Sequence, residues 1–289
     1  MARHSRRRRS TWSPSCPVPS RRFLLAIALV WAPQVAAQVP PDLARDRAEF
    51  AAWLASGPTS PFAAVALQRV GPGITIGPPG SDIPLPGVAA ARVLPASGRI
   101  TVESSGVSRP LPRNRVLPLG SYRLMATGPA ERVTLLVFGA ARGVRTPEYF
   151  PYSGGAVDTV TLTPPSQRQS ALFLGPDGIE ADADDAGSVT GTLIGAPVTL
   201  KVRRFPGASD DEPELEIYFR DGTSGNGSYP AGRFVSLDPI GGGRYRLDFN
   251  RARSPFCAYS SVYPCPAPWP GNTIAGRIEA GERYHGSEQ

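Results

Sequence analysis

The stretch that decides the fold is LEIYFRDGTSGNGSYPAGRFVSLDPIGGGRYRLDFNRARSPFCAYSSVYPC, residues 215–265. Apolar and polar residues alternate over 215–220 and again over 244–249, which is the pattern of strands that bury one face. The glycine-rich segments 221–232 and 241–243 are typical of turns. The stretch therefore predicts strands joined by tight turns, with most of the chain's unusual polar residues gathered around them.

The same pattern continues on both sides of this stretch. The chain has 289 residues, of which 33 are proline and 31 glycine, and these residues interrupt it too often for long helices. We expect strands near 65–70, 74–76, 92–94, 99–103, 122–126, 132–138, 158–163, 171–174, 189–193, 198–205, 215–220, 233–237 and 244–249. The expected fold class is all-β, with sandwich or barrel-like antiparallel sheets and one N-terminal helix after a cleaved signal.

The first 37 residues have the order of an export signal. A basic segment precedes an apolar run over 23–31, and Val-Ala-Ala then offers a cleavage site before Gln38. The apolar run is too short to span a bilayer. Arg21-Arg22 leaves both the general and the twin-arginine export routes open. We therefore expect a periplasmic or secreted protein whose mature chain has no membrane span.

The rest of the chain divides into a helix and two β halves. Residues 41–56 repeat apolar residues at helical spacing, and Gly57-Pro58 ends the repeat. We expect the signal over 1–37, the helix within 38–57, a first β half over 58–145 and a second over 146–286.

Charge argues against a nucleic-acid partner. The formal net charge is +7, but seven of the 31 basic residues precede Asp42, the first acidic residue. The remaining 24 basic residues balance the 24 acidic ones. The body of the protein therefore lacks the positive field that attracts nucleic acid.

The residue inventory also narrows the chemistry. The only histidines are His4 and His285, and two cysteines remain after the signal. These numbers exclude a zinc site built from several histidines and an iron–sulfur cluster of four thiolates. The chain has no P-loop or dinucleotide motif. We expect no metal and no cofactor.

Cys257 and Cys265 are predicted to form a disulfide. They are the only cysteines of the mature chain, and export brings them into an oxidising compartment. A reactive pair of thiols is the alternative.

Five polar residues form the candidate binding site: Asp221, Tyr229, Arg233, Asp248 and Asn250. Asp221 ends one predicted strand, Tyr229 and Arg233 begin the next, and Asp248 and Asn250 share the outward face of a third. If these strands adjoin, the side chains meet at one end of the sheet and form a small polar pocket. The alternative is a network that braces the turn.

Three classes of function remain open, and the sequence does not decide whether the protein is an enzyme. The first is an exported module that binds a small polar or saccharide-like ligand. The second is a metal-independent hydrolase or lyase that uses Asp221, Asp248 or Glu282 as acid and base. The third is a structural envelope protein.

The second half resembles the family called domain of unknown function 1684. The motifs are DGTSG followed by Y-x-x-GR, then LDFN, P-x-CA, CP and AGE, and the resemblance extends from about Pro61. A glutamate usual in the turn is Gly227 here. The resemblance implies no established reaction. Its residues are Asp221, Thr223, Ser224, Gly225, Tyr229, Gly232, Arg233, Leu247, Asp248, Phe249, Asn250, Pro255, Cys257, Ala258, Cys265, Pro266, Asn272, Ala280, Gly281 and Glu282.

The first half carries a shorter resemblance. The segments GPGITIGPPGSDIPLPG (71–87) and ASGRITVES (96–104) are similar to the early strands of forkhead-associated domains, which are phosphopeptide-binding sandwiches. The histidine that often follows in those domains is absent, since Ala89–Ala91 occupy that region.

Overall fold

The computed structural model describes residues 38–96, 99–167, 169–206, 214–267 and 269–286. The predicted export signal over 1–37 lies outside the described residues. Within them, no helix has the length and apolar character needed to cross a membrane.

One α-helix, α1 (Pro41–Ser56), forms where the apolar spacing predicts it. Proline at its first position suits a helix start, because the N–H that proline lacks has no partner there. Leu43, Phe50 and Leu54 form its buried face. Short 3-10 turns are η1 (Pro61–Ala63), η2 (Ala130–Arg132), η3 (Gly154–Ala156), η4 (Phe249–Arg251) and η5 (Phe256–Ala258).

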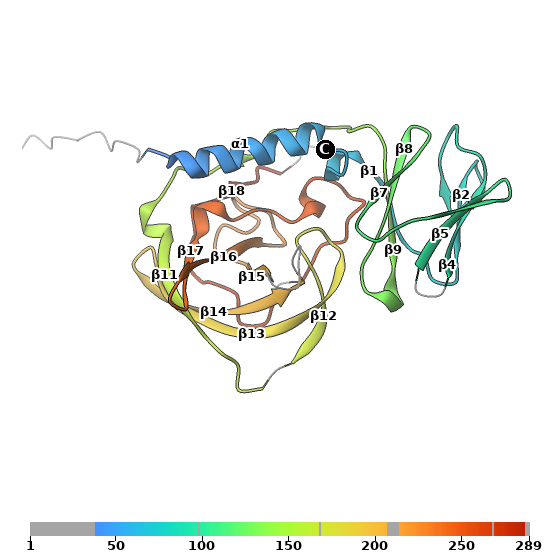
Figure 1. Cartoon of the computed structure of the whole chain (residues 1–289). Coiled ribbons are helices and arrows are strands. Elements are labelled where there is room, and N and C mark those ends of the chain that lie inside the picture. Colours follow the sequence, from blue (N-terminus) through green and yellow to red (C-terminus); the bar gives the residue numbers. More distant parts are fainter. Residues whose placement is uncertain (1–37, 97–98, 168, 207–213, 268, 287–289) are drawn as a thin grey trace, which may run out of the picture. The chain divides into compact units, whose positions relative to one another are not determined.

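Two sheets make up the first β half (Figure 1). One has the order β1-β9-β8-β7, and the other has the order β3-β2-β4-β5-β6, in which β2 and β3 pair in parallel. Side chains of both sheets, such as Ile76, Val93, Leu124 and Leu135, fill one core, so the arrangement is a sandwich. The forkhead-associated resemblance implies such an architecture, but the resemblance itself stays a prediction. The strands are β1 (Ala64–Arg69), β2 (Ile74–Gly77), β3 (Ile83–Pro84), β4 (Ala91–Ala96), β5 (Arg99–Ser104), β6 (Val107–Pro110), β7 (Val116–Leu119), β8 (Tyr122–Thr127) and β9 (Thr134–Phe138).

Six strands of the second half close into a barrel in the order β11-β17-β16-β15-β14-β13 (Figure 1). The ring closes where Leu162 and Thr163 of β11 pair with Val189 and Ser188 of β13. β12 pairs with β13 outside the ring, and β10 pairs with β18. The strands are β10 (Glu148–Tyr149), β11 (Val157–Thr163), β12 (Ser170–Leu174), β13 (Glu180–Leu193), β14 (Ala196–Phe205), β15 (Glu214–Phe219), β16 (Arg233–Gly241), β17 (Arg244–Asp248) and β18 (Glu282–Arg283).

A bulge in β13 makes this closure possible. The register of β13 against β14 shifts between Asp185 and Gly187. A Cβ atom on Gly187 would lie 1.9 Å from the Thr163 carbonyl oxygen, so glycine allows β11 to approach β13 at this point. The sequence predicted this strand only from Val189, because the acidic segment before it is poor in strand-forming residues.

The alternation in β15 builds the barrel core as predicted. Leu215, Ile217 and Phe219 point inward and belong to the main apolar cluster. Their outward neighbours Glu216 and Tyr218 are also buried, with exposed fractions of 6% and 0%. Other parts of the chain must therefore cover the outer face of the barrel at β15.

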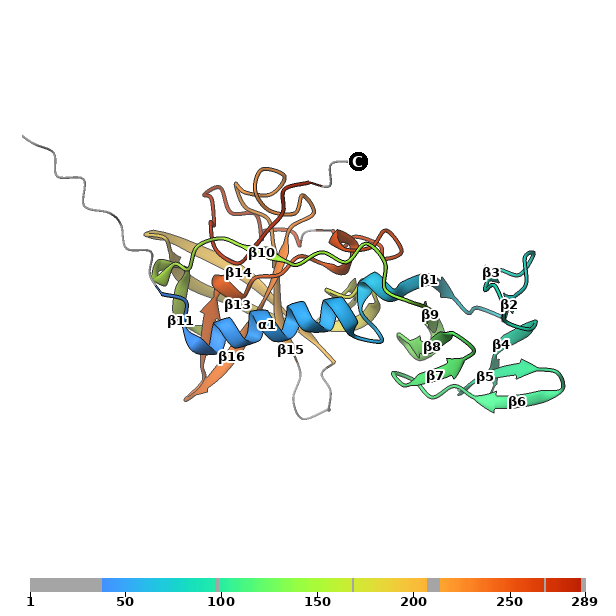
Figure 2. The same cartoon turned by 90° about the horizontal axis from the view of Figure 1, so that it is seen from above.

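Helix α1 provides part of that cover, and Figure 2 shows it crossing β15 and β16. Arg253, in the segment after β17, places Nη2 2.7 Å from Asp46 Oδ1 of the helix. On the apolar side, Phe50 of α1 packs against Tyr259 with ring centroids 6.2 Å apart. Ion pairs and aromatic packing therefore fix the helix to the segment after β17.

The fold class predicted from the sequence is confirmed: the described chain is mostly strand, antiparallel and barrel-forming, with one N-terminal α-helix. Every predicted strand has a counterpart in the structure. The strand expected over 132–138 begins at Thr134, because the residues before it form η2. Five short strands were not predicted: β3, β6, β7, β10 and β18.

Candidate functional site

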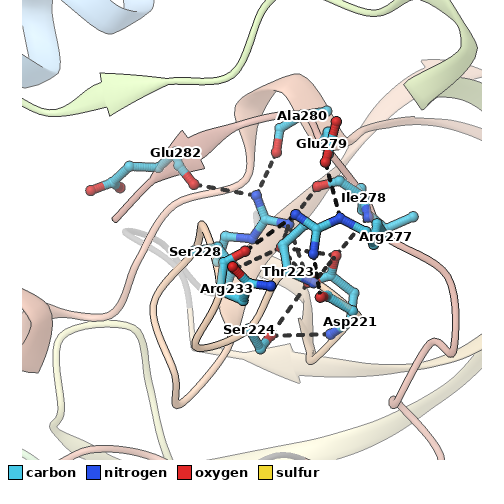
Figure 3. A network of polar contacts seen from close by, with 12 residues as sticks. Asp221, Thr223, Ser224, Ser228, Arg233, Arg277, Ile278, Glu279, Ala280 and Glu282 are labelled. Carbon is cyan, nitrogen blue, oxygen red and sulfur yellow. Dashed lines mark hydrogen bonds and ion pairs between the residues drawn. The ribbon is translucent and has the colours of Figure 1, made fainter. Parts of the chain in front are cut away.

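Arg233, the first residue of β16, lies fully buried among polar groups (Figure 3). Its Nη2 lies 3.3 Å from Asp221 Oδ1 and donates to the Ile278 carbonyl oxygen at 2.9 Å. Its Nη1 donates to the carbonyl oxygens of Ala280 and Glu282. Burial lowers the pKa of Arg233, and the Asp221 carboxylate opposes that shift. We refer to Asp221, Arg233 and these three carbonyl groups as the Arg233 network.

Asp221 holds the other side of the network. Its Oδ2 accepts from the Ile278 N–H at 2.6 Å, and both of its oxygens accept from the Thr223 hydroxyl at 2.9 Å. The Thr223 hydroxyl also lies 2.8 Å from the Ser228 hydroxyl across the turn. The Arg233 network therefore ties the segment 278–282 to the glycine-rich turn, and these contacts support the bracing interpretation.

Asp248 and Asn250 form a second, separate brace. Asp248 Oδ1 accepts from the backbone N–H and the side-chain amide of Asn250, at 3.0 and 2.9 Å. The side chain of Asn250 bonds in turn to the backbone N–H and carbonyl of Ser153, both at 2.9 Å. The expectation that both residues lie on one strand needs correction: β17 ends at Asp248, whose carboxylate caps η4, and Asn250 lies within that turn.

Tyr229 contacts a third place. Its hydroxyl donates to the Cys257 carbonyl oxygen at 3.2 Å, and its ring meets Tyr284 edge to face at 4.9 Å. In the described residues no side-chain hydrogen bond or ion pair joins Tyr229, the Arg233 network and the Asp248–Asn250 pair to one another. The structure thus brings together two pairs of the five predicted residues but not all five, and their role in binding stays a prediction.

The predicted disulfide is confirmed. Cys257 and Cys265 are bonded, with Cα atoms 5.4 Å apart. The closed loop is short, so chain-entropy arguments give a stabilisation of about 2–3 kcal/mol. The Tyr229 hydroxyl lies 3.4 Å from Cys265 Sγ, so the loop lies beside Tyr229.

A cleft that the sequence analysis did not predict lies between α1 and the outer face of the barrel. We call it the helix–barrel cleft; its volume is about 600 Å³. Helix α1 provides one wall, β15 and β16 form the base, and the segment after β17 forms the opposite wall. Its lining residues are Asp46, Glu49, Phe50, Trp53, Pro176, Glu216, Phe234, Ser236, Asp238, Arg251, Arg253, Ser254 and Phe256.

Glu216 is the most unusual group in the helix–barrel cleft. Its Oε1 accepts from the Ser236 hydroxyl at 2.6 Å, and in the described residues no arginine, lysine or histidine pairs with it. Burial raises the pKa of the Glu216 carboxyl to about 7, and the carboxylates of Glu214 and Asp238 add to the rise. The Ser236 hydrogen bond and Arg253 oppose it. Glu216 is therefore a carboxyl group that can gain or lose a proton near neutral pH.

Ser254 is a second buried polar residue that lines the helix–barrel cleft. The residue is 3% exposed. Its hydroxyl has no hydrogen-bond partner in the described part of the chain. Buried polar groups are usually hydrogen-bonded, so this buried hydroxyl is an exception beside the cleft.

Glu282 is a second buried carboxyl with a raised pKa. Burial raises the pKa of Glu282 to about 7. Hydrogen bonds from Tyr259 and Ser254 lower this pKa in part, and so do the charges of Arg253 and Arg233. Its Oε2 accepts from the Ser254 N–H at 2.9 Å and its Oε1 accepts from the Tyr259 hydroxyl. It lines a hollow of only about 190 Å³. Both of its oxygens already have partners, which makes it a weaker candidate than Glu216.

Other hollows have fewer buried polar side chains in their lining. One, of about 830 Å³, opens on the first β half and has no buried polar side chain among its described lining residues. Another, of about 630 Å³, lies beside the glycine-rich turn and includes Gly227. Its buried polar residue, Ser228, already contacts Thr223. In the described residues no cluster of three or more histidine, cysteine or acidic side chains could hold a metal ion.

Comparison with known proteins supports the family resemblance. A family model described as "Protein of unknown function (DUF1684)" matches residues 145–283. The match confirms the resemblance predicted from the motifs, and it covers the second β half rather than the chain from about Pro61. No curated protein matches the chain.

Among solved structures, the chain is similar to the solution NMR structure of an uncharacterized protein of Haloarcula marismortui. The two are 29% identical, and the similarity covers 50% of this chain and 79% of that chain, with a TM-score of 0.43.

Proposed function

We propose that the protein is an exported binding module that holds a small polar or saccharide-like ligand in the helix–barrel cleft. One observation carries the proposal: Glu216, 6% exposed, lies at the base of a 600 Å³ cleft without a basic partner in the described residues. A buried carboxyl group is unfavourable unless another group compensates it. A ligand with hydroxyl or amine groups would supply that compensation.

The lining of the helix–barrel cleft suits such a ligand. Trp53 and Phe256 are partly exposed aromatic rings with centroids 5.6 Å apart, and they offer apolar faces. Ser236, which is exposed, offers a hydroxyl group. Pockets for small molecules combine an apolar lining with a few placed polar groups in this way. The predicted pocket residues around Arg233 then act as the frame of the barrel that carries the cleft.

Tryptophan fluorescence tests the proposal. Outside the predicted signal the chain has two tryptophans: Trp53 in the helix–barrel cleft and Trp269, which is 3% exposed in an aromatic cluster. We expect at least one probe from a panel of monosaccharides, polyols and small ammonium compounds to change the fluorescence. The change should persist in Trp269→Phe and vanish in Trp53→Phe. A panel that changes neither the tryptophan fluorescence nor the melting temperature would contradict the proposal.

Export is part of the same proposal. The disulfide supports it, because such bonds persist in oxidising compartments. Mass spectrometry of the protein from its source cell should find Gln38 at the N-terminus and two hydrogens missing at Cys257 and Cys265. A chain that keeps residues 1–37 and carries free thiols would contradict periplasmic or secreted localisation.

A metal-independent hydrolase or lyase is the second candidate. Asp221 and Asp248 already accept contacts from arginine and amide groups. These contacts do not favour the two aspartates as the acid and base of such an enzyme. The observation that favours an enzyme is Glu216 with a pKa of about 7, close to Asp238, whose pKa burial also raises. Hydrolysis of chromogenic glycosides that Glu216→Gln abolishes would favour this candidate over simple binding.

A further inference from the structure

The helix–barrel cleft has an excess of acidic groups over available basic ones. Asp46, Glu49, Glu216 and Asp238 line it, against Arg251 and Arg253. Both arginines are already engaged by the helix: Arg253 Nη2 lies 2.7 Å and Arg251 Nη1 3.5 Å from the two oxygens of Asp46.

Three carboxyl groups therefore remain without a basic partner in the described residues. In the described residues, Glu49, Glu216 and Asp238 have no basic atom within ion-pair distance. Glu216 and Asp238 lie on adjacent strands, since Glu216 pairs with Ser236 in the sheet and Asp238 is two residues further along β16. Such diagonal neighbours on one face lie close enough to act on the same bound group.

The aromatic lining of the cleft favours the same sign of charge. Aromatic ring faces attract cations. The cleft already shows one such contact, because the Arg253 guanidinium lies 4.1 Å from the ring centroid of Phe50. Phe234, Trp53 and Phe256 offer further rings around Glu216.

We propose that the ligand of the helix–barrel cleft carries a small organic cation, an ammonium or quaternary nitrogen, which lies against the carboxylates of Glu216 and Asp238 and the rings of Trp53 and Phe256. This inference rests on the proposed function, because it specifies the chemistry of the ligand in the same cleft. Ser254, which lines the same cleft, has a buried hydroxyl without a hydrogen-bond partner in the described residues.

Proton linkage follows from this geometry. Glu216 is surrounded by the acidic groups of Glu214 and Asp238 and by Arg253, with Asp46, Glu49 and Arg251 also lining the cleft. A cation selects the ionised form of Glu216. With a pKa of about 7, the ionised fraction, and with it the apparent affinity, should rise about tenfold between pH 6 and pH 8.

Choline and its neutral isostere 3,3-dimethyl-1-butanol provide a matched pair of probes, because they share shape but differ in charge. Titration followed by Trp53 fluorescence should give, at pH 8, a dissociation constant for choline at least tenfold lower than that for 3,3-dimethyl-1-butanol. The pH effect should appear for choline alone. Glu216→Gln should remove both the preference and the pH effect. Asp238→Asn, at an exposed position, should weaken choline binding several-fold even if the Glu216 variant folds poorly. Glu103→Gln, in the first β half, is the matched control and should change nothing.

The outcomes separate the two proposals. Equal binding of choline and 3,3-dimethyl-1-butanol, or binding of neutral monosaccharides alone, would overturn the cation inference and leave the binding function standing. The absence of any fluorescence response to either probe and to the monosaccharides would overturn both.

Discussion

Replacing Arg233 with alanine should lower the free energy of unfolding by about 3–5 kcal/mol, because it leaves Asp221 as an uncompensated buried charge. Both side chains are fully buried, with Arg233 Nη2 3.3 Å from Asp221 Oδ1. The substitution also removes the donors to the carbonyl oxygens of Ile278, Ala280 and Glu282. Urea unfolding of the two proteins at one pH measures the difference.

Two further variants sharpen this test. Arg251→Ala is the matched control. Arg251 also pairs with aspartates, but its side chain is 23% exposed. This substitution should therefore lower the free energy of unfolding by about 1 kcal/mol or less. Replacing both Arg233 and Asp221 with apolar residues of similar volume should recover part of the stability, because no charge is left unpaired. Near-native unfolding of Arg233→Ala would contradict the bracing role and return Arg233 to the predicted pocket.

The Arg233 network also explains what much of the family signature does. Asp221, Thr223 and Arg233 come from the DGTSG and GR motifs, and the carbonyl groups to which Arg233 donates include that of Ala280 in the AGE motif. Gly281, between Ala280 and Glu282, has φ +76°, and a Cβ atom there would lie 2.5 Å from the Phe249 carbonyl oxygen. These motif residues therefore join distant segments, and their pattern in the sequence reflects the fold more than a reaction.

The fold was largely predictable because its strands alternate or run apolar over short distances. The apolar run over 133–138 became β9, which is buried along its length between β1 and β8. β13 was predicted too short, since its acidic first half has low strand propensity and is held by pairing on both sides. Local sequence cannot show that a distant strand will supply those hydrogen bonds.

The candidate site was harder to predict for a related reason. In β15, Glu216 occupies an outward position, which for an exposed sheet implies contact with water. It is buried because α1 and the segment after β17 cover that face, and they are far from it in the sequence. The only signal was the amphipathic pattern of α1, which requires some apolar surface to pack on but does not say which.

The stability of the protein should fall as the pH rises from about 5 to about 8. An exposed glutamate carboxyl group has an ordinary pKa of 4.5. Burial raises the pKa of Glu216 and that of Glu282 to about 7 in the folded protein. Between these two values the folded state holds more protons than the unfolded state, so raising the pH favours unfolding. The contribution of each carboxyl group to the free energy of unfolding is fully present below the pKa that the group has in the unfolded state. It is lost as the pH rises through the pKa that the group has in the folded state. The loss for each group is on the order of 3 kcal/mol.

Glutamine variants assign this loss to particular groups. Glu216→Gln and Glu282→Gln should each flatten the plot of unfolding free energy against pH between 5 and 8, and the double variant should flatten it most. Asp177, whose pKa burial raises to about 6, should leave a residual slope at the acidic end. Urea unfolding at pH 5, 6, 7 and 8 provides the measurement. A Glu216→Gln protein with the same slope as the parent would mean that the carboxyl group is ionised in the folded state at all these pH values. It would then already have a cationic partner, and the helix–barrel cleft would lose its main claim to a ligand.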